Sequence, residues 1–416
     1  MNSRERILAT LHRKPVDRLP VDLGGTRQTG IAARAYHRLR ERLGLATGRP
    51  VRVFDLCQML AEVEQSVCDR FGADCVWLPR PAVEYNFGIE NGNWKRWQLH
   101  DGTPVEVPGG FHPVEEPDGC LVLMHNGVPA GRMPRGGFYF ERVGKFPGAA
   151  HPNLSTWRPP RVANSAMEHY AQQAEALDSG TDKAIVAAFG PAYDLFYAIG
   201  HGGFEDWMMT FASEPEYVQE LYGLMVEAWL DDLKRFYAAV GNRVHVIILT
   251  DDFGMQSAPF LSETMFRELV LPAYKRGFDW IHANTPWKVL LHSDGAIFSL
   301  IPALIDMGVD ILNPVQTSAA GMDPVKIKAA FGDKLLFWGG ACDCQNTLTF
   351  GTPQQVAAEV RINVPALARG GGLVLGSVHN IQDNVPPDNI ITMFDTAREF
   401  DGFVRKTSAE AATGRG

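Results

Sequence analysis

The feature that most constrains this chain is a short apolar segment that recurs eight times, ends in polar residues and is followed by a helical stretch. Near-continuous apolar runs of this length indicate strands buried on both faces, as in a parallel sheet. Eight strands alternating with helices are typical of a closed (β/α)₈ barrel, and the alternative is an open doubly wound sheet. We predict the α/β fold of the TIM-barrel type. The eight segments span residues 20–25, 74–79, 184–190, 244–252, 288–295, 310–315, 334–342 and 372–380.

The region from about residue 83 to residue 143 breaks this alternation. It is rich in dipeptides that favour tight hairpins, among them Asn91-Gly92, Asp101-Gly102 and Asn126-Gly127. We predict an antiparallel β-hairpin insertion after the second barrel strand, which would cover the barrel mouth or form the contacts of a homodimer. The chain would then be a single barrel domain over residues 1–405, followed by a disordered polar tail over residues 406–416.

Helix signals lie between the apolar segments. Ser213 and Glu216 have the spacing of a capping box, and Gly241 stands where the helix that follows them would end. Thr352 precedes a proline that suits the first position of another helix. These signals place helices between the third and fourth strands and between the seventh and eighth.

Composition excludes several classes of protein. The 39 Lys and Arg residues against 48 Asp and Glu give a formal net charge of −9, which argues against nucleic acid as the partner. No apolar run approaches the roughly 18–20 residues of a membrane span, and the charged amino terminus has no signal core. Six cysteines in 416 residues are too few for a disulfide scaffold. We therefore expect a cytoplasmic protein with reduced thiols.

Polar residues collect where the predicted strands end. In a TIM-type barrel the site lies beyond the carboxyl ends of the strands, so the fold would bring these side chains together. The residues at those ends are Asp22, Arg27, Gln28, Tyr193, Asp251, Asp252, His292, Asp294, Asn313, Cys342, Asp343, Cys344, Gln345, His379 and Asn380.

The most informative of these residues are His292 and Asp294. In an extended segment residues i and i+2 point the same way, so this imidazole and this carboxylate would face one pocket. His379, from the last strand, would add a third ligand. Two imidazoles and one carboxylate suit Zn²⁺ or Fe²⁺ with a position open to substrate. The alternatives are an acid–base pair without metal, or groups that cap loop backbone.

Two further pairs carry alternatives of their own. Asp251 and Asp252 would act as a general base, a metal support or a substrate anchor, or only one of them would face inward. Cys342 and Cys344 flank Asp343 in a C-x-C pattern. One thiolate would join a metal site if its pKa were lowered, and otherwise both cysteines behave as small apolar residues.

At this point several motifs resemble the uroporphyrinogen decarboxylase superfamily. The likeness extends over most of the chain outside the predicted insertion, and it implies a (β/α)₈ barrel with its pocket at the strand ends. The motifs are Asp251-Asp252-Phe253-Gly254, Leu271-Pro272, His292-Ser293-Asp294-Gly295, the run from Trp338 to Asp343, His379-Asn380-Ile381-Gln382 and the run from Pro386 to Ile390.

The resemblance implies one of two chemistries. The decarboxylases remove carboxyl groups from a tetrapyrrole without a metal, and their strand-1 motif carries two arginines, of which this chain keeps only Arg27. Segment 74–79 also lacks their acid at the end of strand 2. A substrate with many carboxylates needs a cationic pocket, so these losses count against that chemistry.

The corrinoid-dependent methyltransferases are the closer resemblance. Their zinc ligands form a His-x-Cys pair followed by a later Cys. Here His292 matches the first ligand, while Asp294 and His379 stand in the places of the two thiolates. The resemblance therefore implies a metal that acts as a Lewis acid on an O-methyl or N-methyl group.

We hypothesise a methyltransferase that moves a methyl group from a small-molecule donor to a corrinoid carried by a partner protein, or to a folate. The alternatives are a cofactor-free decarboxylase acting on uroporphyrinogen or another carboxylate, and a non-enzymatic binding module. The expected metal ligands, for Zn²⁺ or Fe²⁺, are His292, Asp294 and His379. The expected catalytic residues are Asp252, Asp343 and Tyr193. The expected substrate-binding residues are Arg27, Gln28, Asn313, Gln345 and Asn380.

Overall fold

The computed structural model describes the 416 residues except 47, 85–88, 143–151, 193, 197–203 and 414–416. Within the described residues, seven parallel strands form one sheet in the order β17-β16-β15-β14-β13-β12-β3. Each lies inside one of the apolar segments that the sequence singles out. The strands are β3 (Cys75–Trp77), β12 (Ala184–Ala188), β13 (Val246–Thr250), β14 (Lys288–His292), β15 (Ile311–Asn313), β16 (Leu336–Trp338) and β17 (Leu373–Val374).

The remaining apolar segment, residues 20–25, closes the ring with a single residue. Val21 forms parallel bridges to Ala73, just before β3, and to Leu375, just after β17. The Asp74 N–H donates to the Val21 carbonyl oxygen at 2.7 Å. The chain then turns at Gly24, whose φ of +82° lies in the region that favours glycine, so a longer strand does not form. The prediction of a TIM-type α/β barrel is confirmed.

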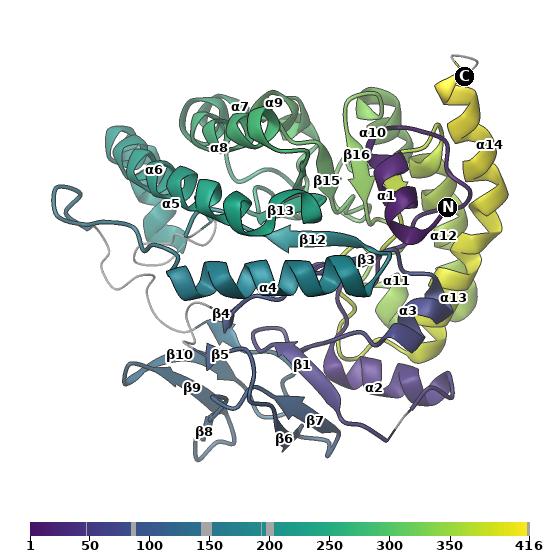
Figure 1. Ribbon diagram of the computed structural model, residues 1–416, viewed down its shortest axis with the longest axis horizontal. Coiled ribbons are helices and arrows are strands. Elements are labelled where there is room, and N and C mark those ends of the chain that lie inside the picture. Colours follow the sequence, from purple (N-terminus) through teal and green to yellow (C-terminus); the bar gives the residue numbers. More distant parts are fainter. Residues whose placement is uncertain (47, 85–88, 143–151, 193, 197–203, 414–416) are drawn as a thin grey trace.

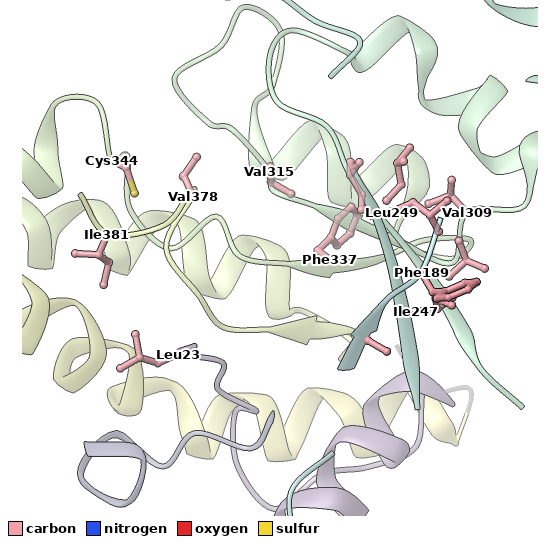
Figure 2. Packing of buried hydrophobic residues seen from close by; sticks show 14 of the residues in the cluster. Leu23, Phe189, Ile247, Leu249, Val309, Val315, Phe337, Cys344, Val378 and Ile381 are labelled. Atoms are coloured by element: carbon pink, nitrogen blue, oxygen red, sulfur yellow. The ribbon is translucent and has the colours of Figure 1, made fainter. Parts of the chain in front are cut away.

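The strands are buried on both faces because their side chains alternate between two apolar cores. Val246 and Ile248 of β13 belong to a cluster to which all seven strands contribute, which places that cluster in the barrel interior. Ile247 and Leu249 belong to the larger core outside the ring. Figure 2 labels these two residues, together with Phe337 of β16, among the residues of this core.

Helix α1 (Ser3–Leu11) lies at the amino end of the barrel. Its Ile7 and Leu11 join the interior cluster. The backbone N–H of Arg4 donates to the carbonyl oxygen of Asp182, just before β12, at 2.6 Å. The amino end is therefore filled, and the carboxyl end remains for the site.

Helices surround the sheet in Figure 1. None of the described helices combines the length and the hydropathy needed to cross a membrane. The remaining α-helices are α2 (Ala33–Arg42), α3 (Gln65–Phe71), α4 (Asn164–Gly180), α5 (Phe204–Ser213), α6 (Pro215–Val240), α7 (Glu263–Met265), α8 (Leu271–Asn284), α9 (Ile301–Met307), α10 (Pro324–Phe331), α11 (Thr347–Phe350), α12 (Pro353–Ala368), α13 (Pro387–Ala397) and α14 (Asp401–Ala412). A π-helical turn, Phe266–Val270, joins α7 to α8, and single 3₁₀ turns span Gly241–Arg243, Phe298–Leu300 and Arg398–Phe400.

Three expectations about helix ends have different outcomes. Thr352 caps α12 as predicted, and α6 ends at Gly241 as predicted. The capping box at Ser213 is wrong, because α5 continues through this residue and its hydroxyl donates to the Met209 carbonyl oxygen at 2.8 Å. The tail expected to be disordered from residue 406 is instead helical as far as Ala412, because Val404 and Ser408 of α14 are buried.

Short strands outside the barrel gather below α4 in Figure 1. They form sheets in the orders β2-β1-β7-β6, β11-β10-β9-β8 and β4-β5. β1 and β2 precede β3 yet share a sheet with β6 and β7, so this β-rich part is not confined to the region after the second barrel strand. The strands are β1 (Val51–Asp55), β2 (Leu60–Ala61), β4 (Ala82–Glu84), β5 (Ile89–Glu90), β6 (Lys95–Gln98), β7 (Pro104–Val107), β8 (Val114–Glu115), β9 (Leu121–His125), β10 (Val128–Met133) and β11 (Glu141–Arg142).

Candidate metal centre

The candidate site lies at the carboxyl ends of β14, β15 and β17. His292 is the last residue of β14, and Asp294 follows two residues later. His379 comes five residues after the end of β17. Because all the barrel strands run parallel, residues far apart in the sequence meet at this one end.

Three side chains converge there as the sequence predicts. The Nε2 atoms of His292 and His379 lie 3.6 Å and 3.7 Å from the same carboxylate oxygen, Oδ2 of Asp294. The two imidazole rings are 5.6 Å apart between centroids. One ligand atom from each residue falls within 4.8 Å of the others, so the three groups could hold one metal ion.

Asn313, at the end of β15, orients His292. Its Oδ1 accepts a hydrogen bond from Nδ1 of His292 at 2.6 Å, while its Nδ2 donates to the Trp338 carbonyl oxygen at 2.7 Å. The second bond fixes which end of the amide faces the imidazole, because a carbonyl oxygen only accepts. Nε2 of His292 is thereby left facing Asp294 as the ligand atom. Asn313 is a positioning residue, and its expected role in binding substrate stays a prediction.

Asp252 adds a second carboxylate behind Asp294. Its Oδ1 accepts from the backbone N–H of Asp294 at 2.9 Å. Burial raises the pKa of Asp252, and the negative charge of Asp294 acts in the same direction. Burial opposes the charged forms of Asp294 and His292 as well, but their mutual attraction prevails: the pKa of Asp294 is lowered and that of His292 is raised to about 9. The site therefore stabilises the charged form of Asp294 and the neutral form of Asp252, relative to the same groups in water.

Asp251, the neighbour of Asp252, is turned away from this centre. Its Oδ2 accepts from the backbone N–H of Phe196 and from the Tyr274 hydroxyl, both at 2.8 Å. Of the pair, Asp252 is therefore the carboxylate next to the candidate ligands, while Asp251 joins β13 to α8.

A cavity of about 510 Å³ opens beside the candidate ligands. Asp294, His379 and Gln345 line it, as does Tyr139 from the β-rich part. Sequence reasoning missed Tyr139 and four glutamines of the wall. Three of these glutamines lie close in the sequence to the polar strand ends. Gln256 and Gln316 follow the ends of β13 and β15, and Gln382 follows His379 by three residues.

Three predicted substrate-binding residues make internal contacts instead. The guanidinium of Arg27 forms an ion pair with Asp55, a buried residue of β1. Gln28 donates to the Thr250 hydroxyl at 3.0 Å. The amide of Asn380 is buried between those of Gln58 and Gln382. None of these three lines the cavity. Their polar groups are already paired, with the carboxylate of Asp55, the hydroxyl of Thr250 and the amides of Gln58 and Gln382 respectively.

Two predicted catalytic residues have different outcomes. Both carboxylate oxygens of Asp343 accept hydrogen bonds, one from the Ser318 hydroxyl at 3.2 Å and the other from the Asn346 amide at 2.9 Å. Asp343 also accepts from the Gln345 N–H at 2.9 Å, so it shapes the loop that carries Gln345 to the cavity. Tyr193 lies outside the described residues.

The cysteines behave as apolar residues rather than as ligands. Burial raises the pKa of both Cys342 and Cys344, the latter to about 12. The thiol of Cys344 donates to the His379 carbonyl oxygen at 3.2 Å, and Figure 2 shows it close to Val378. All six cysteines are free thiols. The thiol reading of the C-x-C pattern is thus disfavoured.

A second acidic group lies in the β-rich part and is a weaker candidate. Glu116, Asp118 and Cys120 have ligand atoms within 4.8 Å of one another. Both carboxylates already pair with Arg132, at 3.0 Å and 2.8 Å, which would compete with a cation.

Comparison with known proteins agrees with the fold. Residues 153–400, more than half of the chain, match the profile described as uroporphyrinogen decarboxylase (URO-D). This chain belongs to the uroporphyrinogen decarboxylase family. The matched region of this family member contains β12 to β17 and the three candidate ligands.

Two relatives extend the comparison. A uroporphyrinogen decarboxylase from Azoarcus sp. (strain BH72) is 22% identical over 255 residues, which cover 59% of this chain and 66% of the relative, just under two thirds of its length. The solved structure of a methyltransferase from Methanosarcina mazei covers 96% of this chain and 99% of its own, with a TM-score of 0.59 and 18% identity. At that identity the second likeness establishes the shared fold. Both relatives are named as enzymes.

Proposed function

We propose that this protein is a methyltransferase that moves a methyl group from an O-methyl or N-methyl compound to a corrinoid held by a partner protein. The observation that carries the proposal is the convergence of His292, Asp294 and His379 beside a cavity of about 510 Å³. The methyltransferase from Methanosarcina mazei, which shares the fold along nearly its whole length, supports the same choice.

The residues present fit a divalent metal. Oδ1 of Asp294 is buried without a hydrogen-bond partner, a costly state that coordination would relieve. Its Oδ2 and the two imidazole Nε2 atoms supply a mixed carboxylate and imidazole set, which suits Zn²⁺ or Fe²⁺. When bound, the metal would polarise the oxygen or nitrogen atom that carries the methyl group.

The side chains around this centre would orient the donor and move a proton. The methyl carbon leaves its oxygen or nitrogen without the bonding electrons, and the atom left behind takes up a proton. Asp252 is suited to supply that proton for two reasons. Burial raises its pKa, and the hydrogen bond that its Oδ1 accepts from the backbone N–H of Asp294 holds it next to the candidate ligands. Asn313 keeps His292 in one orientation throughout.

The methyl acceptor would come from outside the chain. The exposed Gln345 lies on the cavity wall, so the cavity opens toward the surface. A corrinoid on a separate protein would approach through this opening, and a folate is the alternative acceptor. Homodimerisation and a cytoplasmic location belong to the same proposal.

Decarboxylation is the second candidate, favoured by the family name and by the relative from Azoarcus. Two features count against a polycarboxylate substrate. Arg27 is paired with Asp55. In addition, no lysine or arginine is found among the described residues that line the cavity. Turnover of uroporphyrinogen by the purified protein would favour this candidate.

Metal analysis tests the proposed centre. The purified protein should hold one equivalent of zinc or iron, and His292→Ala should lose it. The matched control is His100→Ala, since His100 is exposed and lies in the β-rich part. A protein that takes up no stoichiometric metal, or a His292→Ala variant that retains it, would refute the metal assignment. The reaction is then tested by adding cob(I)alamin and measuring the change in cobalamin absorbance as the methyl group is transferred to it.

A further inference from the structure

The wall of the cavity is rich in uncharged amides. Gln58, Gln256, Gln316, Gln345 and Gln382 all line it, while none of the lining residues in the described part of the chain is a lysine or an arginine. A wall of this composition recognises ligands through hydrogen bonds rather than through opposite charge.

Two of these glutamines are engaged at both ends of their amides. The backbone N–H of Gly295 donates to Oε1 of Gln316 at 2.7 Å, and Nε2 of Gln316 donates to Oε1 of Gln256 at 3.0 Å. Nε2 of Gln256 then donates to the Ser318 carbonyl oxygen at 2.8 Å. Because a backbone N–H only donates and a carbonyl oxygen only accepts, both amide orientations are fixed.

A second chain of amides leaves one donor and one acceptor open. Nδ2 of Asn380 faces the Arg27 carbonyl oxygen and also donates to Oε1 of Gln58. Nε2 of Gln382 faces the Asn380 carbonyl oxygen and also donates to Oδ1 of Asn380. The backbone oxygens again fix each amide. Within this chain of amides, the groups left without a hydrogen-bond partner among the described residues are the Nε2 donor of Gln58 and the Oε1 acceptor of Gln382.

We infer that the methyl donor is an uncharged, hydroxyl-bearing molecule, oriented by the amide donor of Gln58 and the carbonyl acceptor of Gln382. A hydroxyl group both donates and accepts, so it matches the two open groups. That this ligand is the methyl donor rests on the proposed methyl transfer. The preference for a neutral ligand follows from the residues of the wall alone.

Charged ligands fit this wall less well. An anion would meet the carboxylate of Asp294 without a neighbouring lysine or arginine among the described lining residues. A cation would compete with the metal for Asp294, the one acidic side chain among those lining residues. The side chains of the wall, as distinct from a bound metal, would therefore leave either charge uncompensated, whereas a hydroxyl group exchanges hydrogen bonds with water for hydrogen bonds with the amides.

Three ligands that share one skeleton test the inference. 3-Methoxybenzyl alcohol, 3-methoxybenzoate and 3-methoxybenzylammonium share the methoxyphenyl ring and differ in one polar group, which is neutral, anionic or cationic. Their binding to the zinc-loaded protein is measured by calorimetry near neutral pH. The alcohol should bind at least roughly tenfold more tightly than either ion. Equal or tighter binding of the benzoate or the ammonium ion would overturn the inference.

Two variants test the residues. Gln58→Met removes the open donor and should weaken alcohol binding by roughly tenfold, and unchanged binding would overturn its assignment. Gln345→Arg, at an exposed side chain outside both amide chains, should raise the affinity for the benzoate several-fold. That variant keeps the test decisive if Gln58→Met does not fold, since a benzoate affinity unchanged by the added cation would overturn the charge argument.

These binding measurements are separable from the proposed reaction. Selective binding of the alcohol without methyl transfer to cob(I)alamin would remove the proposed function and leave the ligand class intact. Methyl transfer from the benzoate in preference to the alcohol would support the proposed function and overturn the inferred ligand class.

Discussion

His245 gives this barrel a measurable sensitivity to acid. It immediately precedes β13, it is half-buried, and its Nδ1 accepts a hydrogen bond from the backbone N–H of Ile185 in β12 at 3.1 Å. Burial, together with the charge of Arg4, lowers the pKa of this histidine from 6.5 to about 4. Protonation of Nδ1 would also break the bond to Ile185.

The direction and the size of the effect follow from linkage. Between pH 6.5 and about 4 the unfolded chain binds a proton at His245 that the folded chain does not, so the free energy of unfolding decreases as the pH falls through this window. The difference of pKa corresponds to about 3 kcal/mol. That stabilisation is complete above the unfolded pKa and is lost toward the folded one.

The substitution that isolates this effect is His245→Asn. The amide oxygen can still accept from Ile185, yet the side chain does not titrate. We expect the stability difference between the wild type and the variant to change by about 3 kcal/mol between neutral pH and pH 4, as measured by urea unfolding at several pH values. His100→Asn, at an exposed histidine, controls for loss of a histidine as such. Parallel pH profiles of wild type and His245→Asn would refute the reasoning.

Three further predictions concern the site and the packing. Asn313→Leu should weaken zinc binding about 10- to 100-fold, because His292 loses the acceptor that orients it; an unchanged dissociation constant in a chelator competition would contradict this role. Arg27→Met should lower the free energy of unfolding by about 3–5 kcal/mol, because Asp55 stays buried without its cation, while the metal content is unchanged; loss of metal without loss of stability would place Arg27 in the site instead. Gly277→Ala should cost about 1–3 kcal/mol in urea unfolding, since the new Cβ would lie 1.9 Å from Cζ3 of Trp229; Gly223→Ala in α6, with no atom within 4 Å of the new Cβ, is its control and should not destabilise.

The sequence predicts the barrel and the convergence of the candidate metal ligands for one physical reason. Parallel strands buried on both faces appear as apolar runs, and their carboxyl ends meet, so the positions of His292, Asp294 and His379 follow once the strands are found. A spacing of two residues along an extended segment then suffices to pair the first two ligands.

The sequence cannot predict how buried polar groups choose their partners. Arg27 turns to Asp55 of β1, a strand whose place beside it no local pattern reveals. Asp343 shapes a loop instead of facing the cavity, and Ser213 bonds back to its own helix. The end of the chain becomes helical because Val404 and Ser408 find a buried surface. Each outcome depends on tertiary contacts between distant parts of the chain.

Closure of the ring through single bridges at Val21, supported by backbone hydrogen bonds of Pro20 and Asp22 to Leu375, has a consequence for the integrity of the whole fold. Neighbouring strands elsewhere in the sheet share two or more paired residues, whereas at this seam each side is joined by one bridge. The barrel therefore resembles a curved seven-stranded sheet whose two edge strands, β3 and β17, are joined by a short segment near the amino terminus. A chain trimmed past Val21 would lose this connection together with α1, which fills the amino end of the barrel. We expect such a chain to have an open barrel.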